Sequence, residues 1–482
     1  MHRKEARHGR CARRHHHPRD LLGPRRGRPA ARLLRVRGHA RLRVPHRAAE
    51  APEGRHRAQQ TEIQEALFAD IGRPPFEAYI EISTAIEDLN HTLKHLKRWM
   101  KPKRVGTTMW AQPGRSRIES TPQGVTLIMG PYNYPFLLLL QPLIGSLAAG
   151  NTAILKPSSL TPAVSAVVTK LAARTFSPEY VSVFEGSTEV TDALLEQRFD
   201  HIFFTGSPRV GRIVMAAAAK HLSKVTLELG GKSPTIVHKD ANLTVAARRT
   251  LAGKMLNAGQ TCVAPDHVHV HADVKEAFER ELKAAVIEFY GEDPIRSPDF
   301  GRMINQRHFD RVASLIDKAK VLVGGQTSRE QKFIAPTVLK DVRMDDAVMQ
   351  EEIFGPVLPL ITYSTLDELI ANLKRLPEHP LALYLFTESK AVERRVLDSV
   401  QFGGGCVNNT VMHVANPNLP FGGVGESGLG AYHGKSSFDV FSHQRGILEA
   451  TTKIDLPIRY APYGRHLPLI GDRLELVKKM IK

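Results

Sequence analysis

Between residues 125 and 229, short aliphatic runs alternate with segments in which apolar residues recur at helical spacing. Four runs have the length and the β-branched character of buried strands: 125–129, 152–155, 201–205 and 225–229. The helical pattern that follows the second run begins with Thr161, a good N-cap, and Pro162, a good first residue. Strands that alternate with helices predict a parallel α/β sheet. The pattern continues after residue 230, which predicts a second α/β domain.

The chain has 482 residues, which is too long for one ordinary core and indicates two or three domains. Before the alternating region, residues 60–69 and 77–99 have the apolar spacing and the charge content of surface helices. The stretch 107–120 is short and polar and contains Gly and Pro, so we expect a hairpin there. No stretch of 18 or more apolar residues occurs, and we therefore expect no integral membrane segment.

The formal net charge of +18 is concentrated near the amino terminus. Residues 1–60 hold 18 of the 67 Lys and Arg residues but only 4 of the 49 Asp and Glu residues. We therefore expect no nucleic-acid binding from residues 58–482. The atypical basic segment 1–57 lacks the Ser of a mitochondrial presequence and the apolar core of a secretory signal. A disordered tail, an artefactual translation of GC-rich DNA and a nucleic-acid-binding arm stay open for it.

The three cysteines, Cys11, Cys262 and Cys406, are widely spaced. They make neither a disulfide framework nor a CxxC metal site. We therefore expect no metal, a reducing compartment and a cytoplasmic location.

Cys262 lies among small and polar residues in NAGQTCVAP (257–265). A single cysteine in such a setting is usually a small core residue. A free thiol has a pKa of about 8.5, so a nucleophilic cysteine needs help to become a thiolate. Gly259 would permit close approach of a substrate or a cofactor. The segment by itself leaves both roles of Cys262 open.

Glu228 stands near the end of an apolar strand, in TLELGGKSP (226–234). A carboxylate in such a strand is either salt-bridged or functional. Burial would raise its pKa towards neutrality and would make it a competent general base.

Two turns at strand ends are candidate binding elements. The turn from Gly206 through Ser207 to Gly211 follows a predicted strand and precedes a predicted helix, which is the setting of a phosphate-binding turn. It has two glycines rather than the three of the usual dinucleotide fingerprint, so a plain strand–helix turn is the alternative. Asn133, in GPYNYPF (130–136), either caps the following helix or donates to an oxyanion, where one donor changes a rate by on the order of 10²–10³.

The order and combination of these segments resemble the aldehyde dehydrogenase superfamily from about residue 60 to residue 460. Within it, the sequence is most similar to the class 3 group, which includes fatty and aromatic aldehyde dehydrogenases. Seven segments carry the resemblance: GPYNYPF (130–136), LKPS (155–158), FTGSPRVG (204–211), LELGGKSP (227–234), NAGQTCVAPD (257–266), EEIFGPVLP (351–359) and LPFGGVGESGLGAYHGKSSFDVFSH (419–443).

The resemblance implies a catalytic role for three residues. Cys262 would attack the aldehyde carbon, and the side-chain amide of Asn133 and the backbone N–H of Cys262 would hold the oxyanion of the thiohemiacetal. Hydride loss would leave a thioester, which a water activated by Glu228 would hydrolyse to the carboxylic acid. One nucleophile, one base and one oxyanion donor suffice for such a two-step route.

The resemblance also implies NAD or NADP as the cofactor. The residues expected to bind it are Lys156, Gly206, Ser207, Gly211, Glu352 and Phe354. Many relatives carry Glu where this chain has Ser159, and that Glu binds the ribose hydroxyls and repels a 2′-phosphate. Since a hydrogen bond to a charged group contributes about 1.5–3 kcal/mol, we expect NADP to support turnover within roughly tenfold of NAD.

The fold that the resemblance implies is an α/β fold with a Rossmann-like cofactor domain, an α/β catalytic domain and a small bridging β element used in dimerisation. The expected boundaries are 58–101 with 122–229 for the NAD(P)-binding domain, 230–428 for the catalytic domain, 102–121 with 429–456 for the bridging element, and 457–482 for a carboxyl-terminal tail. A homodimer that acts on a small-molecule aldehyde is expected, with medium- to long-chain aliphatic or aromatic aldehydes as the substrate class.

Two other functions compete with this prediction. A coenzyme-A-acylating semialdehyde dehydrogenase would have the same fold, but Glu228 as a water-activating base favours hydrolysis over transfer to a thiol. A non-catalytic relative would retain the fold without activity, and the joint presence of Cys262, Glu228 and Asn133 argues against it.

Overall fold

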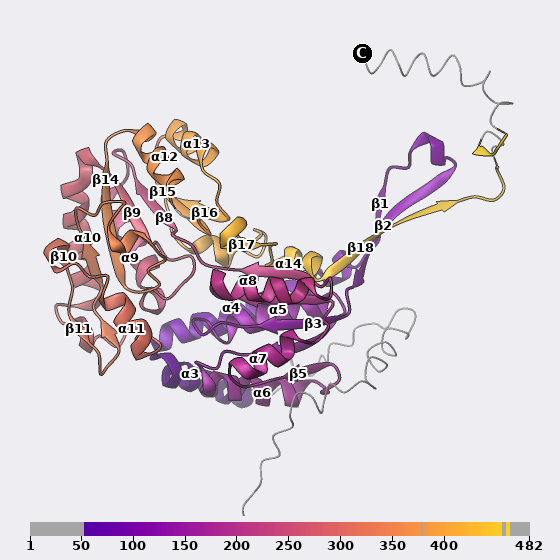
Figure 1. Ribbon diagram of the computed structural model, residues 1–482, viewed down its shortest axis with the longest axis horizontal. Helices are drawn as coiled ribbons and strands as arrows, with labels where there is room; N and C mark the ends of the chain where they lie inside the picture. Colours follow the sequence, from indigo (N-terminus) through magenta and orange to yellow (C-terminus); the bar gives the residue numbers. More distant parts are fainter. Residues whose placement is uncertain (1–52, 377–378, 456–458, 463–482) are drawn as a thin grey trace, which may run out of the picture. The chain divides into compact units, whose positions relative to one another are not determined.

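The computed structural model describes residues 53–376, 379–455 and 459–462, which fall into two compact units (Figure 1). The larger unit holds the described part of Met1–Trp99 together with Pro122–His443. The smaller unit holds Met100–Thr121 and the described residues from Gln444 onwards. The predictions for the basic segment 1–57 and the tail 457–482 fall almost entirely outside the described residues.

A six-stranded sheet forms the first core of the larger unit, in the order β17-β7-β6-β3-β4-β5. All neighbours are parallel except β17, which runs antiparallel to β7. Its strands are β3 (Val125–Met129), β4 (Thr152–Lys156), β5 (Val181–Val183), β6 (His201–Thr205), β7 (Lys224–Glu228) and β17 (Gly428–Leu429). The parallel sheet predicted from the alternating pattern is therefore confirmed.

Helices cover this sheet and complete its core. They are α3 (Glu53–Ile71), α4 (Pro75–Trp99), α5 (Leu137–Ala148), α6 (Pro162–Thr175), α7 (Thr188–Leu195), α8 (Pro208–Ala219) and α14 (Gly434–Val440). α6 starts at Pro162 after Thr161, as predicted, and it buries Val164 and Val168. The two helices predicted near 60–69 and 77–99 are confirmed as α3 and α4. The strand β5 and the helix α7 were not predicted, because each is too short to show a periodic pattern.

A seven-stranded sheet forms the second core, in the order β10-β13-β14-β9-β8-β15-β16. Only β10 and β13 are antiparallel neighbours in it. Its strands are β8 (Pro234–Val237), β9 (His267–His271), β10 (Val321–Val323), β13 (Thr337–Leu339), β14 (Val357–Tyr363), β15 (Ala382–Phe386) and β16 (Gly404–Val407). The helices around it are α9 (Leu243–Met255), α10 (Lys275–Tyr290), α11 (Gln306–Ala313), α12 (Leu366–Lys374) and α13 (Lys390–Ser399). A short pair, β11 (Thr327–Ser328) and β12 (Phe333–Ile334), lies beside them. The chain after residue 230 does form α/β structure, but it shares one compact unit with the first sheet, so a separate second domain stays a prediction.

The smaller unit is a three-stranded sheet of β1 (Lys103–Val105), β2 (Gly114–Pro122) and β18 (Ser442–Ala450). β1 and β2 form an antiparallel hairpin, but only β2 lies in the predicted stretch 107–120, since β1 ends before it. Residues 429–443 belong to the larger unit rather than to this element, which corrects the predicted start of its second part. The physical reason is that α14 packs against α4 and α5.

The carboxyl ends of β3, β4, β6 and β7 lie at one edge of the six-stranded sheet, since these strands are parallel. β3 has β4 on one side and β6 on the other, so the strand order reverses at β3. Parallel sheets bind their ligands at such a reversal, in the crevice outside the carboxyl ends. Asn133, Lys156, Gly206 and Glu228 all stand at this edge.

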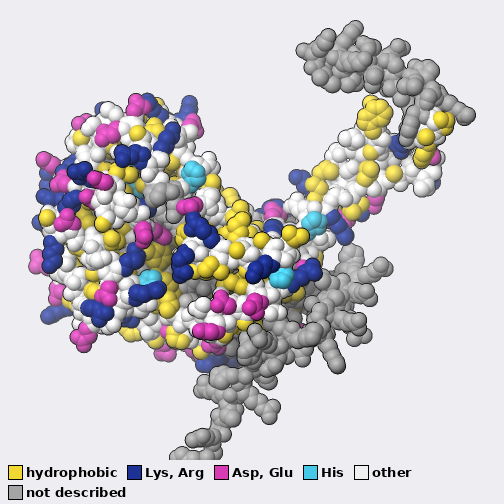
Figure 2. All heavy atoms as spheres, viewed as in Figure 1, with side chains coloured by type: hydrophobic (Ala, Val, Ile, Leu, Met, Phe, Trp, Pro, Cys, Tyr) yellow, Lys and Arg dark blue, Asp and Glu magenta, His cyan; other side chains and the backbone are white. Residues whose placement is uncertain are grey.

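The surface of the larger unit carries charges of both signs. Figure 2 shows Lys and Arg side chains interspersed with Asp and Glu side chains over its visible face. None of the helices that the structure describes is both long enough and apolar enough to cross a membrane.

Candidate functional site

The loop that carries Cys262 begins with three residues of positive φ, a conformation that residues other than glycine rarely adopt. After α9, a 3-10 turn spans Leu256–Gly259, and in it Asn257 and Ala258 have φ values of 53° and 51°. Gly259 follows at φ 76°, and a Cβ there would lie 2.2 Å from the backbone oxygen of Gly355. Glycine is therefore required at 259, although the group that approaches it is the backbone of Gly355 and not the substrate or cofactor that the sequence suggested. The close approach seats the Cys262 loop against the segment that carries Glu352 and Phe354.

Cys262 is half-buried, and its neighbours act on its thiol. Burial raises the pKa of the thiol to about 12, and the carboxylates of Glu352 and Glu228 act in the same direction. The backbone N–H groups of Cys262 and Val263 face the sulfur and lower the pKa. The hydroxyl of Tyr384 donates to the carbonyl of Val263 at 2.5 Å and holds this turn. The resting group is a thiol, so it must lose its proton to a base when it reacts.

Glu228 ends β7 as a buried carboxyl that is 2% exposed. Among the described residues, neither of its side-chain oxygens has a hydrogen-bond partner. Burial raises the pKa of Glu228 well above its usual value, and the group lies close enough to Cys262 to perturb the pKa of the thiol. A buried carboxyl of this kind is a stronger base than an exposed one. It could accept a proton from the thiol or from a water beside it.

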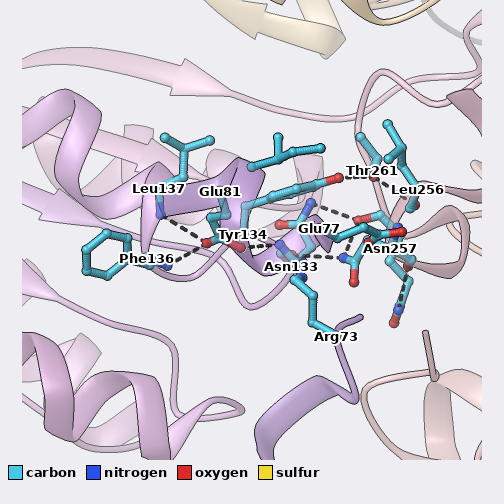
Figure 3. Close-up of polar contacts among 12 residues, drawn as sticks. Arg73, Glu77, Glu81, Asn133, Tyr134, Phe136, Leu137, Leu256, Asn257 and Thr261 are labelled. Carbon is cyan, nitrogen blue, oxygen red and sulfur yellow. Dashed lines mark hydrogen bonds and ion pairs between the residues drawn. The ribbon is translucent and has the colours of Figure 1, made fainter. Parts of the chain in front are cut away.

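Asn133 lies directly beside the cysteine loop (Figure 3). It is buried, and its amide nitrogen donates to the backbone oxygen of Gln260 at 3.1 Å, two residues before Cys262. The next residue, Tyr134, exchanges a hydrogen bond of 2.9 Å with the hydroxyl of Thr261. An amide nitrogen carries two hydrogens, so Asn133 keeps one for a second acceptor. The helix-capping alternative for Asn133 is not what the structure shows, since Glu81 accepts from the first N–H groups at the start of α5.

Three residues around Asn133 were missed from the sequence: Arg73, Glu77 and Glu81. Arg73 is 1% exposed and donates to Glu81 and to the backbone oxygen of Asn133. Glu77 accepts from the backbone N–H of Asn257 at 2.9 Å. The local sequence carried no signal for them, because their contacts with Asn133, Phe136 and Asn257 span 60, 55 and 180 residues.

Lys156 ends β4 with its side chain buried. Its ammonium donates to the backbone oxygens of Pro157 at 2.9 Å and Gly186 at 2.8 Å, and burial lowers its pKa. The carbonyl of Lys156 accepts from the N–H of Gly130, which leads into the segment of Asn133. Ser159, three residues further on, is exposed.

The turn after β6 leads into α8. Gly206 donates its N–H to the backbone oxygen of Glu228 at 3.0 Å, which places the turn beside the buried carboxyl. A Cβ on Gly206 would lie 2.5 Å from the Phe204 ring, and one on Gly211 would lie 2.9 Å from Leu229. Ser207 is the N-cap of α8, and within the described structure its side chain forms no cap hydrogen bond. The first N–H groups of this 12-residue helix are therefore suited to an anion.

Glu352 and Phe354 approach the same edge from the second sheet. A Cβ on Gly230 would lie 2.0 Å from a carboxylate oxygen of Glu352, so this side chain lies against the backbone just after Glu228. Phe354 adopts a φ of 47°, and its ring centroid lies 6.0 Å from that of Tyr132. Both residues thus face the elements that carry Glu228 and Asn133.

These residues fit a dinucleotide. A helix N-terminus suits a phosphate, a buried ammonium suits a hydroxyl or phosphate, and the glycines keep the backbone approachable. No group of three or more His, Cys, Asp or Glu side chains in the described ranges could hold a metal ion. The arrangement combines a thiol, a buried carboxyl, an amide donor and a helix start suited to an anion at one edge of the sheet.

Comparison with known proteins shows which proteins this chain is similar to. Residues 35–447 match the aldehyde dehydrogenase family. The match begins within segment 1–57, earlier than the motifs alone indicated. A 4,4'-diaponeurosporen-aldehyde dehydrogenase of Staphylococcus aureus is 47% identical over 429 residues, which cover 88% of this chain and 92% of that protein. The solved structure of the substrate-bound state of Staphylococcus aureus AldH is 43% identical, with a TM-score of 0.82, and the match covers 89% of this chain and 95% of that one.

Two further relatives bear on the class and on the cofactor. Aldehyde dehydrogenase family 3 member H1 of Arabidopsis thaliana is 44% identical over 428 residues, which cover 88% of this chain and 87% of that protein. A dimeric, NADP-preferring aldehyde dehydrogenase of Rattus norvegicus is 46% identical over 387 residues, which cover 80% of this chain and 85% of that protein.

Proposed function

The chain belongs to the aldehyde dehydrogenase family, and we propose that it works through a thioester on Cys262, with Glu228 as the base and Asn133 as the oxyanion donor. It is an enzyme that oxidises an aldehyde with NAD or NADP, and its similarity to family 3 members places it in class 3. The observation that carries the proposed mechanism is the buried carboxyl of Glu228, which has no hydrogen-bond partner in the described part of the chain and lies close to the Cys262 thiol.

The first step is the attack of the Cys262 sulfur on the aldehyde carbon. Glu228 in its ionised form takes the proton of the thiol, and the raised pKa makes that carboxylate a stronger base than an exposed one. The C=O double bond becomes a C–O⁻ single bond as the C–S bond forms. The free hydrogen of the Asn133 amide and the N–H of Cys262 stabilise that oxyanion, and donors fixed in advance are worth most at such a position.

The second step breaks the C–H bond of the thiohemiacetal and leaves a thioester on Cys262. NAD or NADP, when bound, supplies the acceptor for the hydride. Glu228 first releases the thiol proton to solvent. It then takes a proton from a water that attacks the thioester carbon, and the C–S bond breaks to release the carboxylic acid. The proton returns to the Cys262 sulfur, which regenerates the thiol.

Six residues are proposed to hold the cofactor: Lys156, Gly206, Ser207, Gly211, Glu352 and Phe354. The start of α8 would bind the pyrophosphate, Lys156 the adenosine ribose, and Glu352 the nicotinamide ribose, with Phe354 against the ring. Ser159 is exposed and carries no charge, so it would not repel a 2′-phosphate. We therefore expect both NAD and NADP to be accepted.

The names of relatives support a substrate class and an assembly. We propose medium- to long-chain aliphatic or aromatic aldehydes, since the chain is similar to family 3 members and to a 4,4'-diaponeurosporen-aldehyde dehydrogenase. We propose a homodimer, since the rat relative is named as dimeric, and a cytoplasmic location, since Cys262 and Cys406 are free thiols. The division into domains at residues 58–101, 122–229 and 230–428 also stays a proposal.

The test of the mechanism is to trap the thioester. In Glu228→Gln, hydrolysis should slow more than thioester formation, so one equivalent of NADH or NADPH should appear in a burst. Intact mass spectrometry should then show the acyl group of the aldehyde on Cys262. Cys262→Ala should give no turnover but should still bind cofactor, while the matched variant Cys406→Ala should stay active.

Two results would contradict the mechanism. Turnover by Cys262→Ala would exclude the nucleophile, and an acyl group on another residue would reassign it. A product that forms only when coenzyme A is added would instead indicate the acylating reaction.

A further inference from the structure

The peptide of Asn133 is held by two donors that come from distant parts of the chain (Figure 3). The guanidinium of Arg73 donates to its carbonyl, and so does the amide of Asn257, at 2.8 Å. The same Asn257 amide also donates to the carbonyl of Gln260 at 3.1 Å, which is the acceptor of the Asn133 side chain. The backbone and the side chain of Asn133 are therefore both fixed relative to the Cys262 loop.

Arg73 is fixed in turn by a buried ion pair with Glu81. Both side chains are fully buried, and the guanidinium also stacks on the ring of Tyr134 at 4.4 Å from its centroid. The second oxygen of Glu81 accepts from the backbone N–H groups of Phe136 at 3.0 Å and Leu137 at 3.1 Å. The pair thus holds the segment of Asn133 at both ends, through the carbonyl of residue 133 and the start of α5.

A second carboxyl of α4, that of Glu77, holds the Cys262 loop where the loop contacts the Asn133 segment. Glu77 accepts from the N–H of Asn257, whose φ of 53° is unusual for a residue other than glycine. The backbone of Asn257 is held in this way while its side chain bonds the Asn133 carbonyl. α4 therefore connects to both partners, the Asn133 segment through Glu81 and the Cys262 loop through Glu77.

We propose that Arg73 is a positioning residue, which sets the Asn133 peptide so that the free amide hydrogen of Asn133 is aimed at the oxyanion formed on Cys262. Arg73 touches none of the reacting atoms and acts only through Asn133. The inference rests on the proposed role of Asn133 and adds to it a residue that no sequence motif identified.

Arginine suits this role better than lysine. A planar guanidinium can donate to a carboxylate and a carbonyl at once and stack on an aromatic ring, whereas an ammonium is a point charge on a flexible stem. Lysine at position 73 would keep the charge opposite Glu81. It would lose the stacking on Tyr134 and could not donate to Glu81 and the Asn133 carbonyl in the same fixed geometry. The Asn133 peptide would then have one fixed donor instead of two.

The test is a double-mutant cycle of Arg73→Lys and Asn133→Ala. An oxyanion donor is worth on the order of 10²–10³ in rate, so a misaimed amide should lower kcat by at least about tenfold in Arg73→Lys. If Arg73 acts through Asn133, adding Arg73→Lys to Asn133→Ala should lower kcat less than threefold further. Independent effects would instead multiply.

Two further measurements separate positioning from a general disturbance of the fold. The Kd of NAD or NADP should stay within about twofold of wild type. The rate at which iodoacetamide alkylates Cys262 should also stay within about twofold, because that displacement develops no oxyanion. Arg329→Lys is the matched control, since Arg329 makes a two-pronged but exposed ion pair with Asp310, and it should leave every reading unchanged.

The outcomes distinguish failure of the proposed mechanism from failure of the positioning role of Arg73. If Asn133→Ala alone leaves kcat unchanged, the proposed mechanism fails. If Asn133→Ala lowers kcat but Arg73→Lys has no effect, or has the same effect with and without Asn133, the positioning role is wrong. Should Arg73→Lys not fold, Glu81→Gln replaces it in the cycle, because it removes the ion pair and keeps an acceptor for the start of α5.

Discussion

Replacing Glu228 with glutamine separates the cost of burying this carboxyl from its use in the reaction. Glutamine has nearly the same shape but carries no titratable proton. Glu228 is 2% exposed and, within the described chain, neither oxygen has a hydrogen-bond partner. We therefore expect Glu228→Gln to lose activity while it gains stability at neutral pH.

The size and the sign of the stability change follow from the raised pKa of Glu228. The folded protein keeps a proton that the unfolded chain releases above its ordinary pKa near 4.5. The contribution of Glu228 is therefore fully present below that pH and is lost as pH rises. The loss is about 1.4 kcal/mol per pH unit while the folded-state group stays protonated, or about 3 kcal/mol at most between pH 5.5 and 7.5. Glutamine shows no such loss.

The assay compares the melting temperatures of Glu228→Gln and wild type at pH 5.5, 6.5 and 7.5, together with kcat. The variant's advantage in melting temperature should grow with pH, and kcat should fall by about 10²–10⁴, the usual worth of a general base. The exposed Glu196→Gln is the control and should leave kcat unchanged. A difference in melting temperature that does not change with pH would refute the reasoning, because Glu228 would then not be an uncompensated buried carboxyl.

Three other predictions concern the cofactor, the cysteine loop and acid stability. Ser159→Glu should raise the NAD-to-NADP ratio of kcat/KM about tenfold or more, and steady-state kinetics that show an unchanged ratio would contradict the proposed cofactor site. Gly259→Ala places a Cβ 2.2 Å from the Gly355 oxygen at a φ of 76°, so it should lower both melting temperature and kcat, whereas Gly446→Ala, with open space around it, should do neither. His201 is buried with its pKa lowered to about 3, so stability should fall as pH drops from about 6.5 towards 3, where the unfolded chain binds the proton and the fold does not. Acid titration should show a shallower loss for His201→Gln, and an identical titration would count against this reason.

The fold could be predicted wherever a local pattern was long enough to repeat. The runs at 125–129 and 201–205 have the bounds of β3 and β6, and Thr161-Pro162 marks the start of α6. β5 has only three residues, and no periodicity can show in so short a segment. The boundary of the larger unit after His443 could not be predicted from a local pattern either, because it depends on the packing of α14 against α4 and α5.

The candidate site divides in the same way. The sequence selected Cys262, Glu228 and Asn133 from their local chemistry and their motifs, and the structure brings them to one edge of a sheet. It did not select Arg73 or Glu81, because the contacts of Arg73 with Asn133 and of Glu81 with Phe136 span 60 and 55 residues. Such contacts exist only once α4 has packed beside α5.

The sequence by itself therefore determined the types of element, the order of the strands along the chain and the residues able to do chemistry, since each depends on side chains near one another in the chain. The tertiary structure alone decided which of these residues meet and what burial does to them. It left Glu228 without a hydrogen-bond partner among the described residues, raised the pKa of the Cys262 thiol, and set Arg73 against the Asn133 carbonyl. These are properties of desolvation and of contact between distant segments, and neither exists before the chain folds.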